Sequence, residues 1–270
     1  MKNKIINLFI ILIVLVIGII MYSKYIGTKG LVVKEYKIAS EKIPSSFSGV
    51  KIVFFSDLLY GSTVNYNDLE ELIEKINELK PDILLFGGNL VSNNYKMNEN
   101  TKDKISILLS KLNAKLGKYY VLGNSDDEKI SKILKDFILI DNSTETLYNE
   151  DNNQICLSGI GSFLNNKYSV DKISCENTFH IIMSHEPDII DSVINLKPDL
   201  FLAGNTLGGE INVPKFGYLE KFDGSKKYYK EYYQKDDTKI YISTGLGTKK
   251  KYKRLFNKPS ISLFRLKSMN

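Results

Sequence analysis

The chain has 270 residues, of which 43% are hydrophobic and 25% charged, a composition that excludes disordered and fibrous proteins. The formal net charge of +6 comes from lysines spread along the whole chain, so we expect a solvated basic surface and no nucleic-acid partner. Histidine occurs only at His180 and His185, which excludes a site that needs several imidazoles. Whether the two cysteines, Cys156 and Cys175, form a disulfide stays open.

The N-terminal segment is apolar and uncharged over residues 5–21, close to the ~17 to 25 residues that a membrane-spanning helix requires. We therefore predict a single-pass anchor in the cell membrane. A cleaved signal peptide is the alternative, but residues 22–25 do not resemble a small-residue cleavage site. Because large domains are translocated largely regardless of charge, we expect the domain to lie outside the cytoplasm. Residues 1–29 are taken as anchor and linker, and residues 30–270 as one globular domain.

Apolar periodicity in the first half of the domain predicts strands that alternate with helices. The predicted strands cover 31–38, 51–55, 83–86 and 119–122, and the predicted helices cover 66–79, 102–115 and 128–136. Later strands are shorter and are separated by turns such as 150–153, with a short helix from Pro187 to Leu196. These later strands cover 137–140, 145–148, 155–160, 179–183, 200–203, 239–243 and 260–266. Alternation of this kind predicts an α/β fold with parallel strands.

Five of the predicted strands run directly into short loops that contain glycine or polar residues. These loops are Asp57-Leu58-Leu59, Gly88-Asn89, Gly123-Asn124-Ser125-Asp126, Ser184-His185 and Gly204-Asn205-Thr206-Leu207. Ligands of sheets with parallel strands bind beyond the carboxyl ends of the strands, so we expect a common site there. The last loop has the glycine-rich backbone of a metal site, but positions 205 and 207 carry an amide and an aliphatic side chain.

In order and spacing, the five loops resemble the five signature blocks of the calcineurin-like metallophosphoesterases. Those blocks are Asp-x-His, Gly-Asp, Gly-Asn-His-Asp/Glu, a lone His, and Gly-His-x-His. The resemblance covers residues 31–266, and segments 208–214 and 241–259 are similar to the membrane-anchored bacterial branch of the family. It implies a four-layer α-β-β-α sandwich. It also implies two divalent metal ions (Mn, Fe or Zn) that activate a hydroxide for attack on phosphorus.

The resemblance places metal ligands at Asp57, Asn124 and His185, where this sequence matches the family pattern. The sequence departs from the family pattern at five other positions. Histidine ligands are replaced by Leu59, Asn205 and Leu207, the bridging aspartate by Asn89, and the histidine that protonates the leaving group by Ser125. Leucine offers no lone pair to a metal, and without the bridging carboxylate two dications repel each other strongly. We therefore expect no metal cofactor and no binuclear hydrolysis.

The favoured interpretation is a membrane-anchored pseudoenzyme that binds a partner protein or an anionic ligand. The alternative is a divergent phosphoesterase that hydrolyses a phosphoester with one residual metal on the matching residues, Asp57, Asn124 and His185. A third hypothesis is a retained phosphate pocket that uses Arg254 and backbone amides. The three matching residues also fit structural roles as turn caps and hydrogen-bonded side chains.

Other polar residues are assigned structural roles. Asp126, Asp127 and Glu128 are predicted to begin a helix, because negative charge is favourable at a helix N-terminus. His180 lies within an apolar strand and is predicted to be part of the core. The basic loop 249–254, with Lys226 and Lys227, is expected to be a solvated surface, with an anionic head group as the alternative partner.

Overall fold

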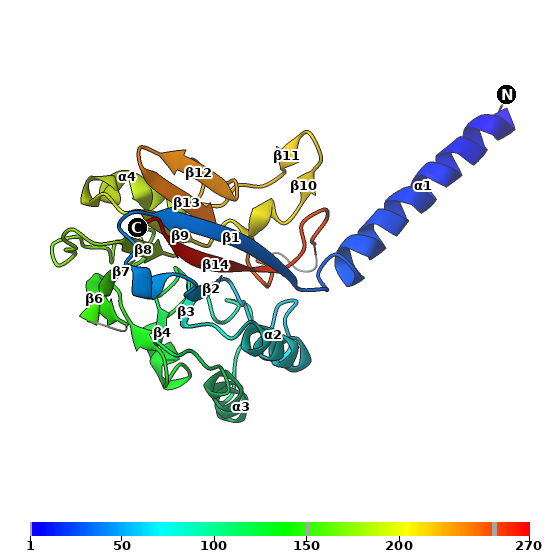
Figure 1. The fold of residues 1–270 in the computed structure, drawn as a ribbon. Coiled ribbons are helices and arrows are strands. Elements are labelled where there is room, and N and C mark those ends of the chain that lie inside the picture. Colours follow the sequence, from blue (N-terminus) through cyan, green and yellow to red (C-terminus); the bar gives the residue numbers. More distant parts are fainter. Residues whose placement is uncertain (1, 150–151, 250–252) are drawn as a thin grey trace.

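A single long helix precedes the rest of the molecule. The computed structural model describes residues 2–149, 152–249 and 253–270. Its first element, α1 (Lys2–Tyr25), extends away from the remainder of the chain (Figure 1). Among the described residues, α1 is the one helix long and apolar enough to cross a membrane, and its apolar window is unburied. The predicted N-terminal apolar helix is therefore present as a candidate membrane span.

Two sheets of the described residues contain six strands each, and β10 (Asn212–Val213) and β11 (Gly217–Tyr218) form a separate two-stranded sheet. In spatial order the strands of the first sheet are β1 (Val32–Ser40), β14 (Ser260–Ser268), β2 (Lys51–Phe55), β3 (Ile83–Phe86), β4 (Lys118–Tyr120) and β5 (Ile138–Leu139). Neighbouring strands are parallel except at the antiparallel β14–β2 pair. Helices α2 (Tyr66–Leu79) and α3 (Glu99–Ser110) pack their apolar sides on its outer face and form one core with it.

The second sheet also contains six strands. Their order is β12 (Tyr232–Lys235), β13 (Thr238–Ile242), β9 (Leu200–Ala203), β8 (His180–Ser184), β7 (Gln154–Ile160) and β6 (Ser143–Tyr148). The inner four strands are parallel, and both edge strands are antiparallel to their neighbours. Short helical turns cover the outer face: η4 (Pro187–Ile189), α4 (Ile190–Val193) and η5 (Ile194–Leu196).

The two sheets face each other across a shared apolar core. Ile52 and Phe54 of the first sheet and Ile181 and Met183 of the second are buried in the same cluster. Side chains alternate between the faces of a strand, and helices or turns cover the outer faces, so the central strands are apolar on both sides. The layers are thus helix, sheet, sheet and helix, which confirms the predicted α/β four-layer sandwich.

The prediction of an α-helix over 128–136 is wrong. Only a 3-10 helix, η2 (Glu128–Lys132), forms there. Its repeat of three residues per turn places Ile130 and Ile133 on one side, and both are buried. The apolar spacing that suggested an α-helix is therefore satisfied by a tighter turn.

Two further differences concern the boundaries and the number of elements. The helix predicted over 102–115 begins earlier, because the Asn98 side chain caps it by accepting a hydrogen bond from the Thr101 N–H at 2.8 Å, and it also ends earlier, at Ser110. Strand β12 was not expected, since this exposed edge strand contains no apolar run. The remaining short elements are η1 (Ser45–Phe47), η6 (Leu207–Gly209), β10 (Asn212–Val213) and β11 (Gly217–Tyr218). The predicted turn 150–153 and basic loop 249–254 lie partly outside the described residues.

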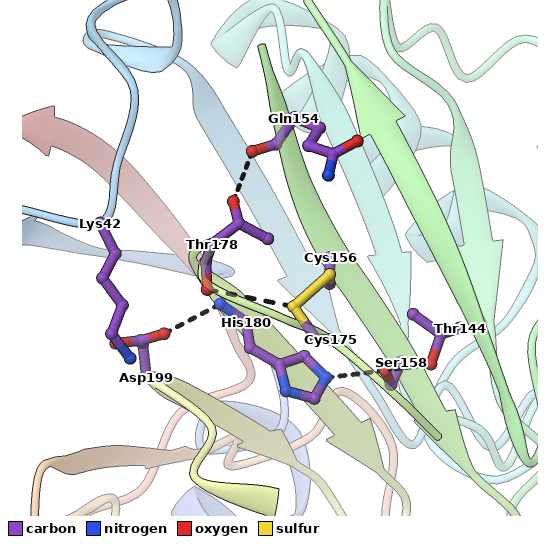
Figure 2. Close-up of a disulfide and its surroundings, with 9 residues drawn as sticks. All are labelled: Lys42, Thr144, Gln154, Cys156, Ser158, Cys175, Thr178, His180 and Asp199. Carbon is purple, nitrogen blue, oxygen red and sulfur yellow. Dashed lines mark hydrogen bonds and ion pairs between the residues drawn. A yellow bond between two sulfur atoms is a disulfide. The ribbon is translucent and has the colours of Figure 1, made fainter. Parts of the chain in front are cut away.

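Cys156 and Cys175 form a disulfide, which joins β7 to the segment before β8 (Figure 2). Beside it, His180 is buried on β8, as predicted, and its Nε2 lies 2.8 Å from the Ser158 Oγ. Burial lowers the pKa of His180 to about 4, although the nearby Asp199 carboxylate opposes this shift. The imidazole is therefore neutral at neutral pH.

Candidate functional site

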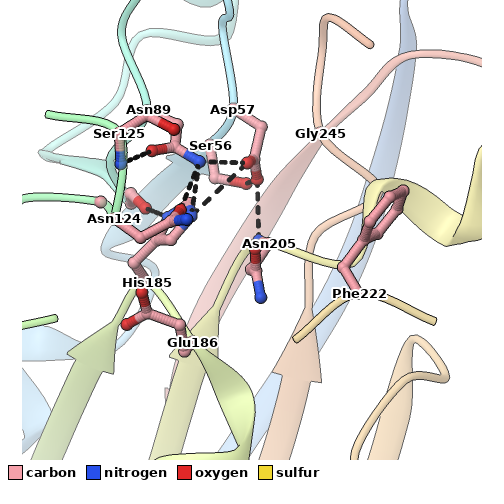
Figure 3. Close-up of polar contacts among 12 residues, drawn as sticks. Ser56, Asp57, Asn89, Asn124, Ser125, His185, Glu186, Asn205, Phe222 and Gly245 are labelled. Carbon is pink, nitrogen blue, oxygen red and sulfur yellow. Dashed lines mark hydrogen bonds and ion pairs between the residues drawn. The ribbon is translucent and has the colours of Figure 1, made fainter. Parts of the chain in front are cut away.

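The five polar loops lie together beyond the carboxyl ends of strands from both sheets (Figure 3). Hydrogen bonds join their backbones: the Asp57 N–H donates to the Gly88 carbonyl, and the Gly204 N–H to the His185 carbonyl, each at 2.9 Å. The Asn205 N–H donates to the Asp57 carboxylate at 2.8 Å and so links the two sheets. Segments that are distant in the sequence therefore build one site.

Asn89 lies at the centre of this site, and its amide nitrogen faces three acceptors (Figure 3). Nδ2 lies 2.7 Å from His185 Nε2 and 3.2 Å from both Asp57 Oδ1 and Asn124 Oδ1. The amide oxygen accepts a hydrogen bond from the Ser125 N–H at 3.0 Å. A flipped amide would instead place its oxygen against the three acceptors and its NH2 group against the Ser125 N–H. Because an amide nitrogen carries two protons, the buried Asn89 side chain can donate to two of these three acceptors at once, and its shortest contact is to His185 Nε2.

The imidazole of His185 is held in one tautomer. Its Nδ1 lies 2.6 Å from the Gly87 carbonyl oxygen, which can only accept, so Nδ1 carries the proton and Nε2 presents a lone pair. Metal-binding histidines are commonly oriented in this way, through a hydrogen bond from the other ring nitrogen. Here the lone pair faces the Asn89 amide. His185 is thus oriented as a metal ligand would be, but the Asn89 amide lies where Nε2 would bind a metal.

The site loops follow an uncommon backbone path. Five site residues have φ between 45° and 65°, in the left-handed region: Asp57, Leu59, Asn89, Asn205 and Leu207. Aspartate and asparagine tolerate this region, but for a bulky residue such as leucine it is an outlier that costs on the order of 1 kcal/mol or more. Both leucines are buried, so the surrounding structure holds them in place. The strained path is present even where the side chain cannot bind a metal.

Lys249 brings a positive charge into the site from the basic loop. Its Nζ donates to Asn205 Oδ1 at 2.6 Å and lies 4.6 Å from the centre of the Phe222 ring. Burial lowers the pKa of Lys249, whereas the carboxylates of Asp57 and Glu186 act in the opposite direction. A cation of the chain itself therefore lies beside one of the positions where the family pattern has a histidine ligand.

The structure contradicts the predicted role of Asp126 at the start of a helix. It is buried, and its carboxylate accepts hydrogen bonds from the N–H groups of Asn89 at 2.6 Å, Leu90 at 2.9 Å and Gly123 at 2.9 Å. Burial raises the pKa of Asp126, and these hydrogen bonds oppose the rise. Asp127, by contrast, does cap η2. The available signal was that Asp126 stands at the acidic position of the third signature block.

Arg254 supports the loop that follows β13. Its side chain is fully buried, and Nη2 donates to the carbonyls of Thr244 at 2.9 Å and Gly247 at 2.7 Å. Burial lowers the pKa of Arg254 to about 10, so the group remains charged at neutral pH. A phosphate-binding role for Arg254 stays a prediction, and it would require the side chain to become exposed.

The lysines expected beside the basic loop are largely neutralised. Lys226 pairs with Asp223 at 2.6 Å, and Lys227 pairs with Asp191 at 2.5 Å. Lys249 is turned inward. In the described part of the chain, the charges of Lys226 and Lys227 are therefore each compensated by a carboxylate.

An open pocket of about 410 Å³ lies at the site, a size that suits a small ligand. Its lining residues are Leu59, Ser92, Asn93, Asn94, Asn124, Ser125, Leu164, Phe222, Asp223 and Lys249. Amide and hydroxyl side chains outnumber the charged ones, Asp223 and Lys249. Two positions that depart from the family pattern, Leu59 and Ser125, thus face the pocket.

The donor set does not fit a binuclear metal centre. Across the described part of the chain, no three or more His, Cys, Asp or Glu side chains are grouped so that they could hold a metal. Of the residues that match ligands, His185 and Asp57 can supply an imidazole nitrogen and a carboxylate, and Asn124 adds a neutral amide. A cation at these atoms would have to displace the Asn89 amide.

A family model described as calcineurin-like phosphoesterase matches residues 50–263. The chain belongs to the calcineurin-like phosphoesterase family. The uncharacterized metallophosphoesterase YkuE of Bacillus subtilis is 32% identical over 262 residues, which cover 92% of this chain and 90% of that protein. The phosphodiesterase YaeI of Escherichia coli is 27% identical over 73% of this chain and 75% of its own length.

A transmembrane protein with a metallophosphoesterase domain from Danio rerio is 24% identical over 66% of this chain, a match that spans 45% of that protein. Similarity to a transmembrane protein, together with the apolar helix α1, suggests membrane anchoring.

Proposed function

We propose that the protein is a membrane-anchored pseudoenzyme of this family, which acts by binding a ligand or a partner protein and not by hydrolysis. One observation carries the proposal: the Asn89 amide nitrogen lies within hydrogen-bond distance of His185, Asp57 and Asn124, the residues left to bind a metal. A buried amide that is already satisfied is expensive to displace, because its groups would lose their partners.

Lys249 supports the same proposal at a neighbouring position. Two dications held close together require several anionic ligands, and a lysine ammonium is a competing positive charge. Its Nζ is bonded to Asn205, a position at which the family resemblance expects a histidine ligand. Asn89 and Lys249 thus act as internal donors beside positions that match metal ligands in the family pattern, and the pocket at the site is open to a ligand or partner.

Metal analysis of the full-length protein in detergent tests the proposal, in parallel with hydrolysis of bis-p-nitrophenyl phosphate in added Mn²⁺. We expect substoichiometric Mn, Fe and Zn and no hydrolysis above that of a His185→Ala variant. Stoichiometric metal, with activity lost in His185→Ala, would overturn the proposal.

A reverted variant supplies the matched positive control. It combines five substitutions toward the family pattern: Leu59→His, Asn89→Asp, Ser125→His, Asn205→His and Leu207→His. Because the left-handed backbone path is already present, we expect this variant to retain metal through purification. Adding His185→Ala to it should lower the metal content again.

The alternative function is phosphoester hydrolysis with one residual metal on Asp57, Asn124 and His185. The tautomer of His185 favours it, since Nε2 already presents its lone pair toward the site. The Escherichia coli relative is also named a phosphodiesterase. Activity that depends on added metal and is abolished by both Asp57→Ala and His185→Ala would establish this alternative.

We further propose that the domain lies outside the cytoplasm. The Cys156–Cys175 disulfide supports this placement, because disulfides persist in oxidising compartments. A cysteine introduced at the exposed residue Asn93, in a background with both native cysteines replaced by serine, should react with a membrane-impermeant maleimide in intact cells. Reaction only after lysis would contradict the placement.

A further inference from the structure

Besides Ile26, which directly follows α1 and is 56% exposed, three large apolar side chains of the domain are exposed on the side from which α1 extends (Figure 1). Phe216 is 90% exposed, Leu219 71% and Phe256 63%. Phe216 lies between β10 and β11, Leu219 directly follows β11, and the Asn212 N–H of β10 donates to the Leu255 carbonyl at 3.0 Å. We call these three side chains the hairpin surface.

The hairpin surface is attached to the end of α1 through Arg254. The Arg254 N–H donates to the Ser23 carbonyl at 3.1 Å, and a Cβ on Gly27 would lie 1.8 Å from the Arg254 carbonyl oxygen. The β10–β11 hairpin lies on the side of the domain from which α1 extends (Figure 1). The hairpin therefore holds a defined position beside the entry point of α1. We infer that the hairpin surface docks onto the bilayer that α1 enters, with Phe216 and Phe256 at the level of the head groups.

The backbone of Phe256 supports a role for its side chain. Its φ is 54°, in the left-handed region, where glycine or asparagine would be accommodated at lower cost. The exposed ring gains little burial within the chain to offset this cost. Burial of the Phe256 ring at the bilayer surface offsets the cost of this backbone conformation, because aromatic side chains are favoured at membrane interfaces.

Charge around the hairpin surface also fits a bilayer. Lys215 precedes Phe216, and Lys253 and Lys258 flank Phe256, all three lysines being exposed. Lysines near the surface are attracted to anionic head groups. Aromatic side chains interspersed with lysines, next to a candidate span, match the composition of the membrane interface. The inference rests on the proposed membrane anchoring and does not depend on whether the site binds a metal.

Fluorescence quenching tests the inference, because the chain contains no tryptophan. Phe216→Trp introduces one probe into the full-length protein, reconstituted in phosphatidylcholine and phosphatidylglycerol nanodiscs with lipids brominated near the head of the acyl chain. We expect the indole of this variant to lose about half of its emission relative to unbrominated nanodiscs. Phe256→Trp, measured in the same way, gives a second probe that should be quenched comparably.

Two matched probes separate the possible failures. Leu12→Trp, within α1, should be quenched if the helix is inserted. Ile107→Trp should not be quenched, since Ile107 is 62% exposed on α3, away from the anchor (Figure 1). Quenching in Leu12→Trp without quenching in Phe216→Trp and Phe256→Trp overturns the inference and leaves the anchor intact, as expected if a protein partner covers the hairpin surface. Absence of quenching in Leu12→Trp overturns the anchoring itself.

Discussion

At the scale of single residues, the asparagine at position 89 lies at the centre of the site. A carboxylate there would need a positive partner, whereas an amide can donate to the acceptors around it. Asp57 and His185 therefore find a partner inside the chain. On the proposed function, the difference between aspartate and asparagine at this position separates a site that requires a cation from one that does not.

Asn89→Asp should destabilise the protein by about 2 to 4 kcal/mol at neutral pH, because it places a second buried carboxylate against Asp57. Chemical denaturation monitored by circular dichroism measures the loss. Asn93→Asp, at an exposed position of the same pocket, is the matched control and should change stability little. Equal effects of both substitutions would contradict the central role of Asn89.

His180 makes the stability of the protein dependent on pH. Its folded pKa of about 4 lies below the ordinary value of 6.5, so its contribution is complete above about pH 6.5 and is lost as pH falls toward 4. We expect wild type to lose about 2 kcal/mol more than His180→Gln between about pH 7 and about pH 4.5. Comparison with the variant is needed because burial raises the pKa of Asp141 to about 6, which acts in the opposite sense. A pH-independent difference between the two proteins would refute the assignment.

At the scale of elements, the site depends on loops that are fixed by their own backbones. The Asp126 carboxylate holds the loop after β3 and the loop after β4 in one arrangement through three N–H groups. It thereby sets the position of Asn89, which β3 alone would leave free. Such contacts within the chain hold the loops in their path.

Asp126→Ala should therefore cost about 3 kcal/mol of stability, since it leaves buried N–H groups without an acceptor. The adjacent Asp127→Ala removes only the cap of η2 and should cost about 1 kcal/mol. Thermal and urea denaturation of the pair measure the difference. Similar losses for both would show that Asp126 acts only as a helix-start residue.

At the scale of the whole molecule, the anchor and the domain are joined by more than a linker. Ser23 of α1 is buried, and Thr28 donates through its Oγ1 to the Lys24 carbonyl at 3.0 Å. The Arg254 N–H donates to the Ser23 carbonyl across the predicted boundary between residues 29 and 30, and that boundary stays a prediction. Arg254 contacts Ser23 of the anchor, and Lys249, five positions earlier in the sequence, contacts Asn205 of the site.

A soluble chain of residues 22–270 should be more stable than one of residues 30–270 by about 1 to 2 kcal/mol, because the shorter chain loses the Ser23–Arg254 hydrogen bond. Urea denaturation of the two chains at one pH measures this. An identical midpoint would place the domain boundary at residue 30, as the sequence alone predicts.

Sequence patterns located the central strands closely, because strands buried on both faces form continuous apolar runs such as 51–55 and 200–203. They failed at β12, whose polar edge position leaves no such run, and at 128–136, where one apolar spacing fits two helix types. Within the site, the sequence identified which positions differ from the family pattern. It could not identify what replaces a missing ligand.

The sequence by itself determined the family, the order of the strands that carry the site loops, and the five positions that depart from the metal-binding pattern. Only the tertiary structure decided how the site is completed. The Asn89 amide donates toward His185, and Lys249 donates to Asn205, contacts between residues 96 and 44 positions apart. The physical reason is that hydrogen bonding and charge pairing depend on distance in space, which the packing of two sheets sets and local sequence does not record.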